Sequence, residues 1–425
     1  MESIKIGIMG MGNVGTGLYK ILSDNRKKIE EELGKKIEIK KILVRNPEKQ
    51  RDVDVPKGIM TKDVYEIIND PEIQIVVELL GGINPAFDYM KMSIESGKHV
   101  VTANKAVIAT YGKELEDLAK SCGVKLRFEA SVGGGIPIIN TLKESLSGNK
   151  IEEVVGIING TTNFILTQMT TSNIDFEEAL KQAQDKGYAE ADPTSDIEGE
   201  DAAFKLAILS DIAFGKKVDP GEIPREGITK ISQKDIQYAS ELGYKIKLLV
   251  SAKKYDGSLG LHVHPALIPN EHPLASVNNE FNALFIRGNA VGEVMLYGKG
   301  AGSLPTGSAV VGDLIHIIKS IENKGEVAGK GIQEDLKISG EGISQYYIRL
   351  EVIDEPGVLG KIAITFGKHG VSLDSVVQRG RGGRTAPLVF ITHEIERSQL
   401  DKALEEINSF SVVDQIASIL KVENL

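Results

Sequence analysis

The first third of the chain alternates short apolar runs with segments of helical periodicity. Residues 4–9 form the first apolar run, and Leu18, Ile21 and Leu22 follow it at helical spacing. Later apolar runs, bounded by glycine or polar residues, predict further strands at 37–44, 73–80, 99–101 and 126–130. This order of strand, helix and strand predicts an α/β fold in which helices cover both faces of a doubly wound parallel sheet of the Rossmann type.

The pattern of the remaining chain predicts two more domains joined by a linker. Strand-like runs at 151–158, 246–251 and 285–286 predict an α+β domain whose open sheet would suit pairing of two subunits. Residues 322–342 are polar and rich in glycine, which is typical of a linker, and the elements predicted from 346 to 422 follow the order βαββαβ. The predicted domains are 1–130 with a completing segment at about 301–321, then 131–300, the linker 322–342, and 343–425.

A glycine turn follows the first predicted strand and opens the first predicted helix. Its residues are Gly10, Met11, Gly12, Asn13, Val14 and Gly15, which form the GxGxxG pattern. The first glycine permits a tight turn, the second lets the backbone approach a pyrophosphate, and the third lets the helix pack closely on the strand. The helix N-terminus offers N–H groups and a positive dipole end to phosphate. The sequence therefore predicts a dinucleotide site, with a structural glycine turn as the alternative.

The end of the second predicted strand bears on the choice between NAD and NADP. An acidic residue there would hydrogen-bond to the ribose 2′-hydroxyl of NAD. The chain instead has Arg45, with Lys49 and Arg51 close behind. Positive charge at this point favours NADP, while use of NAD as well, or a merely solvated basic turn, stays open.

Composition and charge exclude several classes of protein. The 425 residues carry a net charge of −10 without a block of Lys and Arg, so nucleic acid is not expected as a partner. No apolar stretch reaches the roughly 18 residues that a membrane span needs, and the N-terminus lacks the basic segment of an export signal. Cys122 is the only cysteine, which rules out an intrachain disulfide. We expect a cytoplasmic globular protein in which this thiol is inert.

Two segments that follow predicted strands are expected near a bound ligand. Ligands of doubly wound sheets lie beyond the carboxyl ends of the strands, and Lys105 comes soon after the strand at 99–101. We expect this lysine to face the nicotinamide, with an ordinary surface lysine as the alternative. The strand at 126–130 leads into a glycine-rich loop, 131–137, whose carbonyl groups could hold a cation together with Glu129.

The stretch from Gly187 to Lys205 has the most informative chemistry. Between Glu190 and Lys205 there are six acidic residues and one basic residue. Asp201 and Lys205 are four residues apart on a predicted helix, so their side chains share a face, and Asp196 is expected near the first turn of that helix. Apolar neighbours predict that the helix is largely buried, and a buried lysine must be paired. One pocket could thus offer carboxylates to an ammonium group and a lysine to a reacting oxygen; the alternative is an exposed helix with a stabilising Asp–Lys pair.

Two histidines, His262 and His264, are expected to share one face of a strand. No third ligand lies close to them in the sequence. We therefore predict ordinary strand residues rather than a metal pair.

Taken together, these stretches resemble the homoserine dehydrogenase family, in the bacterial form with a C-terminal ACT domain. The most specific stretch is GYAEADPTSDIEGEDAAFKLAIL, which is similar to the signature of the family. The resemblance covers essentially the whole chain, and it is supported by VVELLGG, HVVTANKA, ASVGGGIP, INGTTNFIL and GKGAGSLPTGSAVVGDLI. It implies oxidation of L-homoserine to L-aspartate 4-semialdehyde with NAD(P)⁺, or the reverse reduction, in the synthesis of threonine, methionine and isoleucine.

The resemblance also implies roles for individual residues. Lys205 would be the acid/base lysine, assisted by Lys105 and Asp201. The substrate would be held by Glu190, Asp196, Asn159, Gly160 and Thr161. The cofactor would be contacted by Gly10, Gly12, Asn13, Val14, Gly15, Arg45, Lys105, Gly187 and Gly302. A structural Na⁺ would be bound by Glu129 and by the carbonyl groups of Val132, Gly134 and Ile136.

The implied reaction agrees with the chemistry of these residue types. Hydride addition to an aldehyde builds negative charge on oxygen, which an ammonium group within about 3 Å can neutralise and protonate. A lysine flanked by carboxylates stays largely protonated at neutral pH. Reduction is therefore expected to run well near neutrality, and oxidation of the alcohol to speed up toward alkaline pH.

The C-terminal βαββαβ order resembles an ACT domain. Such domains typically pair and bind amino acids where they meet, so we expect a homodimer or homotetramer with L-threonine as the leading effector. A domain that serves only assembly is the alternative. Two other functions stay open at this point: another amino-acid dehydrogenase on the same fold, and a sensor that binds dinucleotide or amino acid without turnover.

Overall fold

A computed structural model describes residues 2–56, 58–322, 336–339, 342–378 and 384–423. The chain divides into two compact units, and each unit is formed by segments far apart in the sequence. The first contains residues 1–152, 204–222 and 282–334, and the second contains 153–203, 223–281 and 335–425. Within the described ranges, no helix is long and apolar enough to cross a membrane.

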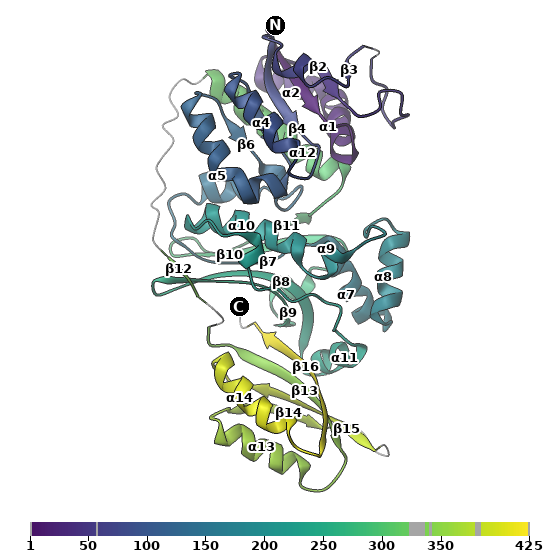
Figure 1. The fold of residues 1–425 in the computed structure, drawn as a ribbon, viewed down its shortest axis with the longest axis vertical. Helices are drawn as coiled ribbons and strands as arrows, with labels where there is room; N and C mark the ends of the chain where they lie inside the picture. The colour runs from purple at the N-terminus through teal and green to yellow at the C-terminus, as the bar shows by residue number, and fades with distance from the viewer. Residues whose placement is uncertain (1, 57, 323–335, 340–341, 379–383, 424–425) are drawn as a thin grey trace. The chain divides into compact units, whose positions relative to one another are not determined.

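The first unit is built on a six-stranded parallel sheet with the strand order β3-β2-β1-β4-β5-β6 (Figure 1). Its strands are β1 (Ser3–Met9), β2 (Lys36–Leu43), β3 (Met60–Thr61), β4 (Ile73–Glu78), β5 (His99–Thr102) and β6 (Leu126–Arg127). The chain moves from β1 to β2 on one side and later returns to β4 on the other. The carboxyl ends of β1 and β4 therefore form the switch point at which such sheets bind ligands. This arrangement confirms the predicted doubly wound sheet.

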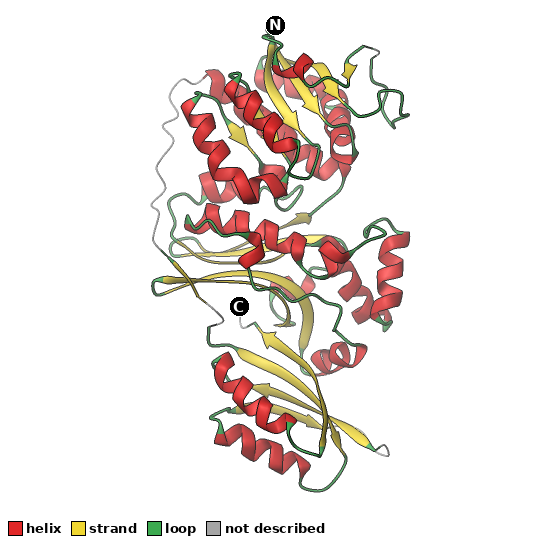
Figure 2. Ribbon diagram, viewed as in Figure 1, coloured by secondary structure: helices red, strands yellow, loops and turns green. Residues whose placement is uncertain are grey.

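Helices cover both faces of this sheet (Figure 2). They are α1 (Asn13–Asp24), α2 (Arg26–Leu33), α3 (Tyr65–Ile68), α4 (Ala86–Glu95), α5 (Lys105–Ser121) and α12 (Ser303–Glu322). Fully buried Ile6 and Ile8 of β1 pack against α1 and α12 on one face. The late helix α12 approaches α1 so closely that a Cβ on Gly17 would lie 2.0 Å from the carbonyl oxygen of Ser303. The unit also contains α6 (Ile138–Asn140), a π-helical turn (Thr141–Ser145), a 3₁₀ turn (Pro220–Glu222), and the paired strands β10 (Phe281–Gly288) and β11 (Gly292–Lys299).

The predicted strand at 126–130 was too long. Strand β6 ends at Arg127, and Glu129–Ser131 form a 3₁₀ turn. The carboxylate of Glu129 accepts hydrogen bonds from the backbone N–H groups of Ile139 (2.8 Å) and Asn140 (2.7 Å). These bonds hold the chain in a turn, because a continuing strand would carry the carboxylate away from its donors.

The second unit contains a mixed sheet with the strand order β7-β8-β9-β16-β13-β15-β14. Its strands are β7 (Ile151–Ile157), β8 (Tyr244–Tyr255), β9 (Ser258–Pro269), β13 (Gln345–Ile353), β14 (Leu373–Gln378), β15 (Thr385–Thr392) and β16 (Val413–Val422). Its helices and turns are α7 (Gly160–Ser172), α8 (Phe176–Asp185), α9 (Thr194–Ile197), α11 (Gln233–Glu241) and the 3₁₀ turn Pro273–Ser276. Helix α10 (Glu200–Phe214) spans the boundary between the two units.

Part of the predicted linker is a strand. β12 (Lys337–Ser339) pairs in parallel with β9, so this piece of the segment at 322–342 belongs to the sheet. Glu322 still belongs to α12, and residues 323–335 and 340–341 lie outside the described residues. Short pairing of this kind has little sequence signal, because three residues carry no readable periodicity.

The C-terminal domain has the predicted βαββαβ order. β13 is followed by α13 (Val358–Lys368), β14, β15, α14 (Arg397–Asn408) and β16. Its core contains the fully buried Tyr346, Phe366 and Phe390. The last strand, β16, extends beyond this core and pairs in parallel with β9, through Lys421 with Ala266 and Val422 with Leu267. The domain is therefore joined to the rest of the second unit by strand pairing.

Two buried groups of charges reinforce this junction. On β13, the guanidinium of Arg349 donates to Asp235 at the start of α11 (2.8 Å) and to Glu351 (2.9 Å). After β16, Glu423 accepts a hydrogen bond from Lys253 of β8 (2.6 Å) and lies 3.2 Å from the ring of His264 on β9. Burial alone would raise the pKa of Glu423, but the bond to His264 and the charge of Lys253 hold it below its usual range.

Candidate active site

The glycine turn lies at the switch point of the parallel sheet. Gly10 has a φ of 107°, and a Cβ there would lie 2.7 Å from the carbonyl oxygen of Leu79. A Cβ on Gly15 would lie 2.5 Å from the carbonyl oxygen of Gly10, so α1 packs directly on the turn. Around Gly12 there is open space, and no side chain caps the start of α1. The turn thus has the tight bend, the close packing and the accessible N–H groups that a pyrophosphate requires.

Two other predicted cofactor residues adjoin this turn. The start of α12 touches it, because the hydroxyl of Ser303 donates to the carbonyl oxygen of Asn13 (2.6 Å), and Gly302 precedes that serine with a φ of 116°. The end of β2 touches it as well, since the N–H of Gly10 donates to the carbonyl oxygen of Leu43 (2.9 Å). Arg45 follows two residues later and is exposed.

Lys105 is the first residue of α5, directly beyond the end of β5. Its neighbour Asn104 caps this helix by accepting from the N–H of Val107 (3.2 Å) and donates its amide to the carbonyl oxygen of Gly82 (2.7 Å). The start of α5 is thereby tied to the loop that follows β4. This arrangement agrees with the predicted position of Lys105 at the ligand-binding edge of the sheet, and its contact with nicotinamide stays a prediction.

The acidic stretch forms a compact group around Asn159. Oδ1 of Asn159 caps α7 by accepting from the N–H of Thr162 (2.9 Å), which turns its Nδ2 toward two carboxylates. This Nδ2 donates to Asp196 (2.7 Å) and to Asp201 (2.9 Å). Asn159 and Asp201 are both about 5 % exposed or less. One amide therefore fixes the separation of two predicted site carboxylates.

The helix that carries Lys205 differs from the prediction at its start. Asp196 belongs to the separate short helix α9, and α10 begins only at Glu200, after Gly199 with a φ of 78°. Asp201 lies in the first turn of α10, and Lys205 follows one turn later with a half-buried side chain. The glycine break between α9 and α10 brings Asp196 beside Asp201 through their shared partner, which a single helix would not do.

Another predicted substrate residue, Thr161, ties the loop at 187–190 to the start of α7. The hydroxyl of Thr161 donates to the carbonyl oxygen of Tyr188 (2.8 Å), and Gly187 precedes that tyrosine with a φ of 74°. The ring of Tyr188 packs on Phe164 with ring centres 5.0 Å apart. Glu190 is exposed two residues further on. The loop that carries the acidic residues is thus anchored at the N-terminal turn of α7.

The predicted cation loop is held in place by its own backbone. The N–H of Gly135 donates to the carbonyl oxygen of Lys299 (3.0 Å), and Gly134 has a φ of 56°. Of the predicted ligands, the carbonyl of Ile136 already accepts from the N–H of Ile138 (2.8 Å). Nearby Asp313 accepts from the N–H of Glu129 (2.8 Å), and burial raises the pKa of Asp313 to about 7. Among the described residues, no group of three His, Cys, Asp or Glu side chains is arranged to hold a metal ion.

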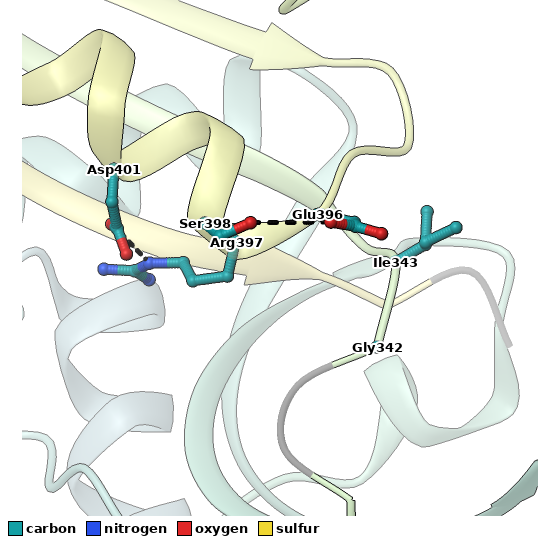
Figure 3. A pocket seen from close by; sticks show the side chains of 6 residues that line it. All are labelled: Gly342, Ile343, Glu396, Arg397, Ser398 and Asp401. Atoms are coloured by element: carbon teal, nitrogen blue, oxygen red, sulfur yellow. Dashed lines mark hydrogen bonds and ion pairs between the residues drawn. The ribbon is translucent and has the colours of Figure 1, made fainter.

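A separate pocket of about 500 Å³ lies in the C-terminal domain (Figure 3). It is lined by Gly342 and Ile343 before β13 and by Glu396, Arg397, Ser398 and Asp401 around the start of α14. Within it, Arg397 donates to Asp401 (2.8 Å), so the cation is already matched by an anion of its own helix. None of the predicted catalytic or cofactor residues lines this pocket.

Sequence comparison places the chain among characterised proteins. The model of the homoserine dehydrogenase NAD-binding domain matches residues 10–129, the homoserine dehydrogenase model matches 137–315, and the ACT domain model matches 346–411. The homoserine dehydrogenase of Bacillus subtilis is 42% identical over 100% of this chain and 99% of its own length. That of Synechocystis is 45% identical over 99% of both chains.

Solved structures show the same similarity. A homoserine dehydrogenase from Thiobacillus denitrificans matches with a TM-score of 0.92 at 39% identity, covering 100% of this chain and 99% of that one. A hyperthermophilic archaeal homoserine dehydrogenase in complex with NADPH matches with a TM-score of 0.63 at 28% identity, covering 75% of this chain and 98% of that one.

The glycine turn at the switch point of the parallel sheet and the match to the NAD-binding domain model define an NAD(P)-dependent oxidoreductase. The matches extend over all three domains and over nearly the full length of the relatives. The chain belongs to the homoserine dehydrogenase family, in the form that carries a C-terminal ACT domain.

Proposed function

We propose that this chain interconverts L-homoserine and L-aspartate 4-semialdehyde with NADP(H) as its preferred cofactor. The observation that carries the proposal is the contact of Asn159 with Asp196 and Asp201, one helical turn before Lys205. The homoserine formed by this chain would be used in the synthesis of threonine, methionine and isoleucine in the cytoplasm. Membership of the family favours this reaction over oxidative deamination by another amino-acid dehydrogenase.

In the proposed mechanism, carboxylates bind the ammonium group of the substrate and a lysine handles the reacting oxygen. Glu190 and Asp196 hold the amino acid, with Asn159, Gly160 and Thr161 at the adjoining end of α7. Lys205 donates a proton to the oxygen during reduction and accepts it back during oxidation, and Asp201 and Lys105 assist it. The bound nicotinamide supplies the hydride chemistry. Asp201 is buried, and the low local dielectric strengthens its charged contacts.

The glycine turn, Gly187, Gly302 and Lys105 would hold the cofactor, and Arg45 would select NADP. An exposed arginine just beyond β2 can pair with the 2′-phosphate, whereas NAD has only a hydroxyl there. The NADPH complex of the archaeal relative supports this choice.

We expect homoserine-dependent formation of reduced cofactor, measured by its absorbance, with a lower KM for NADP⁺ than for NAD⁺. Arg45→Ala should raise the KM for NADP⁺ about tenfold, because it removes one charge-assisted contact, and should change the KM for NAD⁺ by less than about twofold. Lys181→Ala, an exposed lysine on α8, is the control and should change neither value. Binding of NADPH without turnover of homoserine would instead support a sensor, and a reductive reaction that needs ammonia would support a deaminating dehydrogenase.

The C-terminal domain is proposed to bind L-threonine and lower the reaction rate. A chain of contacts supports this: Arg349 of β13 holds Asp235 at the start of α11, and Gln233 of α11 donates to the carbonyl oxygen of Met169 in α7 (3.1 Å). Asn159 is the N-cap residue of α7, and its amide donates to both site carboxylates, Asp196 and Asp201. An effector that moved β13 would thus act on the candidate site through packed helices.

We expect millimolar L-threonine to lower the rate of homoserine oxidation and to raise the midpoint of thermal unfolding, since a ligand that binds only the folded chain stabilises it. D-threonine at the same concentration is the control. If L-threonine changes neither quantity, the domain serves assembly, and a dimer or tetramer seen by light scattering would accord with that role.

A structural Na⁺ at Glu129 and the carbonyls of Val132, Gly134 and Ile136 is part of the proposal. The buried carboxylate and the glycine-rich turn supply oxygen donors of the kind that hard cations prefer. Comparison of thermal unfolding in NaCl and in choline chloride tests it, and equal midpoints would exclude a stabilising Na⁺.

A further inference from the structure

A buried carboxylate lies where two strands of the parallel sheet end. Glu78 is the last residue of β4, Thr102 is the last residue of β5, and the two pair side by side in the sheet. Neither side chain is accessible to solvent. All other positions of β4 are apolar except Gln74, so a fully buried acid at its end needs a physical reason.

A continuous set of hydrogen bonds starts from Glu78. One carboxylate oxygen accepts from the hydroxyl of Thr102 (2.6 Å), and the other accepts from the N–H of Leu80 (2.7 Å). The same hydroxyl accepts from the N–H of Asn104 (2.9 Å), whose amide donates to the carbonyl oxygen of Gly82 (2.7 Å). The carboxylate therefore links the loop after β4 with the start of α5.

This set of bonds also reaches the glycine turn. The N–H of Leu79 donates to the carbonyl oxygen of Met9 (2.8 Å), and Gly10 packs against the carbonyl group of Leu79. Three segments are thus fixed to one another: the turn at Gly10, the loop after β4, and the first turn of α5 with Lys105.

Burial of an acid at this point is costly, which argues against an incidental contact. Burial raises the pKa of Glu78, and the hydrogen bonds from Thr102 and Leu80 oppose that change. An apolar residue would fill the same space without this cost, because paired polar groups in a core are often no more stabilising than apolar ones. What an apolar residue would lack is the ability to orient two loops by directed bonds.

We infer that Glu78 and Thr102 are positioning residues that set the place of Lys105 relative to the dinucleotide held by the glycine turn. The inference rests on the proposed roles of Lys105 and of that turn. Neither residue touches the substrate or the reacting atoms in this scheme; both act through Asn104 and the backbone of the two loops. Displacement of a reacting group by about 1 Å can lower a rate by about a hundredfold, so small shifts of these loops are sufficient.

The test is a double-mutant cycle between Thr102→Val and Lys105→Ala. Thr102→Val removes one donor and one acceptor at nearly constant volume, and we expect kcat for homoserine oxidation to fall at least about tenfold. In the Lys105→Ala background the same substitution should lower kcat by less than about twofold, because there is no lysine left to displace. Thr102→Ser keeps the hydroxyl and should restore kcat to within about threefold of the parent chain.

A matched control is available on the same sheet. Thr61 ends the edge strand β3 and donates to Glu66 (2.7 Å), so Thr61→Val removes a comparable threonine–glutamate bond. It should change kcat by less than about twofold in both backgrounds. Any general loss of stability would appear in both Thr→Val variants, and midpoints of thermal unfolding identify it.

Several results would overturn the inference. If Thr102→Val lowers kcat by the same factor with Lys105 present and with Lys105→Ala, Thr102 has only a structural role. If Thr102→Ser does not restore kcat, loss of the hydroxyl is not the cause of the decrease. If Thr102→Val does not fold, Glu78→Gln takes its place in the same cycle. If the parent chain does not oxidise homoserine, the proposed function fails. The same cycle is then measured on the Kd of NADPH. Additive effects of Thr102→Val and Lys105→Ala on that Kd would overturn the inference.

Discussion

Replacement of Lys205 by alanine is expected to lower kcat for homoserine oxidation by about 10³-fold, because a general acid–base group contributes about 10²- to 10⁴-fold. The Kd of NADPH should change by less than about twofold, since the cofactor is bound by the glycine turn on the parallel sheet. Steady-state kinetics and a fluorescence titration measure the two effects separately. A loss confined to the catalytic step is the expected signature of a group that acts on the reacting oxygen.

The pH dependence of the rate supplies a second readout for the same lysine. In the parent chain, oxidation should accelerate toward alkaline pH, because in the proposed mechanism the alcohol gives up a proton to Lys205. The slow reaction of Lys205→Ala should lack this rise, and Lys181→Ala on α8 should retain it. A flat profile in the parent chain, or a loss of NADPH affinity as large as the loss of kcat, would contradict the proposed role.

The parts of the fold that could be predicted from the sequence are those specified by neighbouring residues. The turn at Gly10 is such a part, because the strand, the three glycines and the helix follow one another within a few residues. Strands β1, β2, β4 and β5 and the order of the C-terminal domain were readable for the same reason: apolar runs bounded by turn residues carry their own signal. Short elements such as β3 and β12 carry too few residues to show a period.

Contacts between distant residues could not be read in this way. The resemblance implied substrate binding for Asn159 but did not predict that its amide joins Asp196 and Asp201, which are 37 and 42 residues away. Glu78 and Thr102 were not predicted as functional, although an acid that ends an apolar strand is a usable signal. Such pairs depend on which strands become neighbours in the sheet, and periodicity along one strand does not contain that information.

Replacement of Arg349 by alanine is expected to lower the free energy of unfolding of the second unit by about 3–5 kcal/mol, because it leaves a buried carboxylate without its cation. Arg349 is 6 % exposed and its partner Asp235 is fully buried, whereas most ion pairs among the residues that the structure describes include an exposed side chain, as Lys368 with Glu406 does. Urea unfolding of the full chain measures the change. The matched control is Lys368→Ala, which removes an exposed lysine paired with Glu406 (2.9 Å) in the same domain and should cost less than about 1 kcal/mol.

A second substitution shows whether Arg349→Ala lowers the stability through the unpaired carboxylate of Asp235 or through lost packing of the guanidinium. Asp235→Asn removes the charge that Arg349→Ala leaves behind, and it keeps an oxygen that can still cap α11 together with Ser232. If the unpaired carboxylate causes the loss, the double variant should be more stable than Arg349→Ala alone. If the loss comes from the missing guanidinium volume, the double variant will be no better. A double variant as stable as the parent chain would mean that the buried ion pair adds little to net stability. Its main contribution would then be to fix where the C-terminal domain packs on α11.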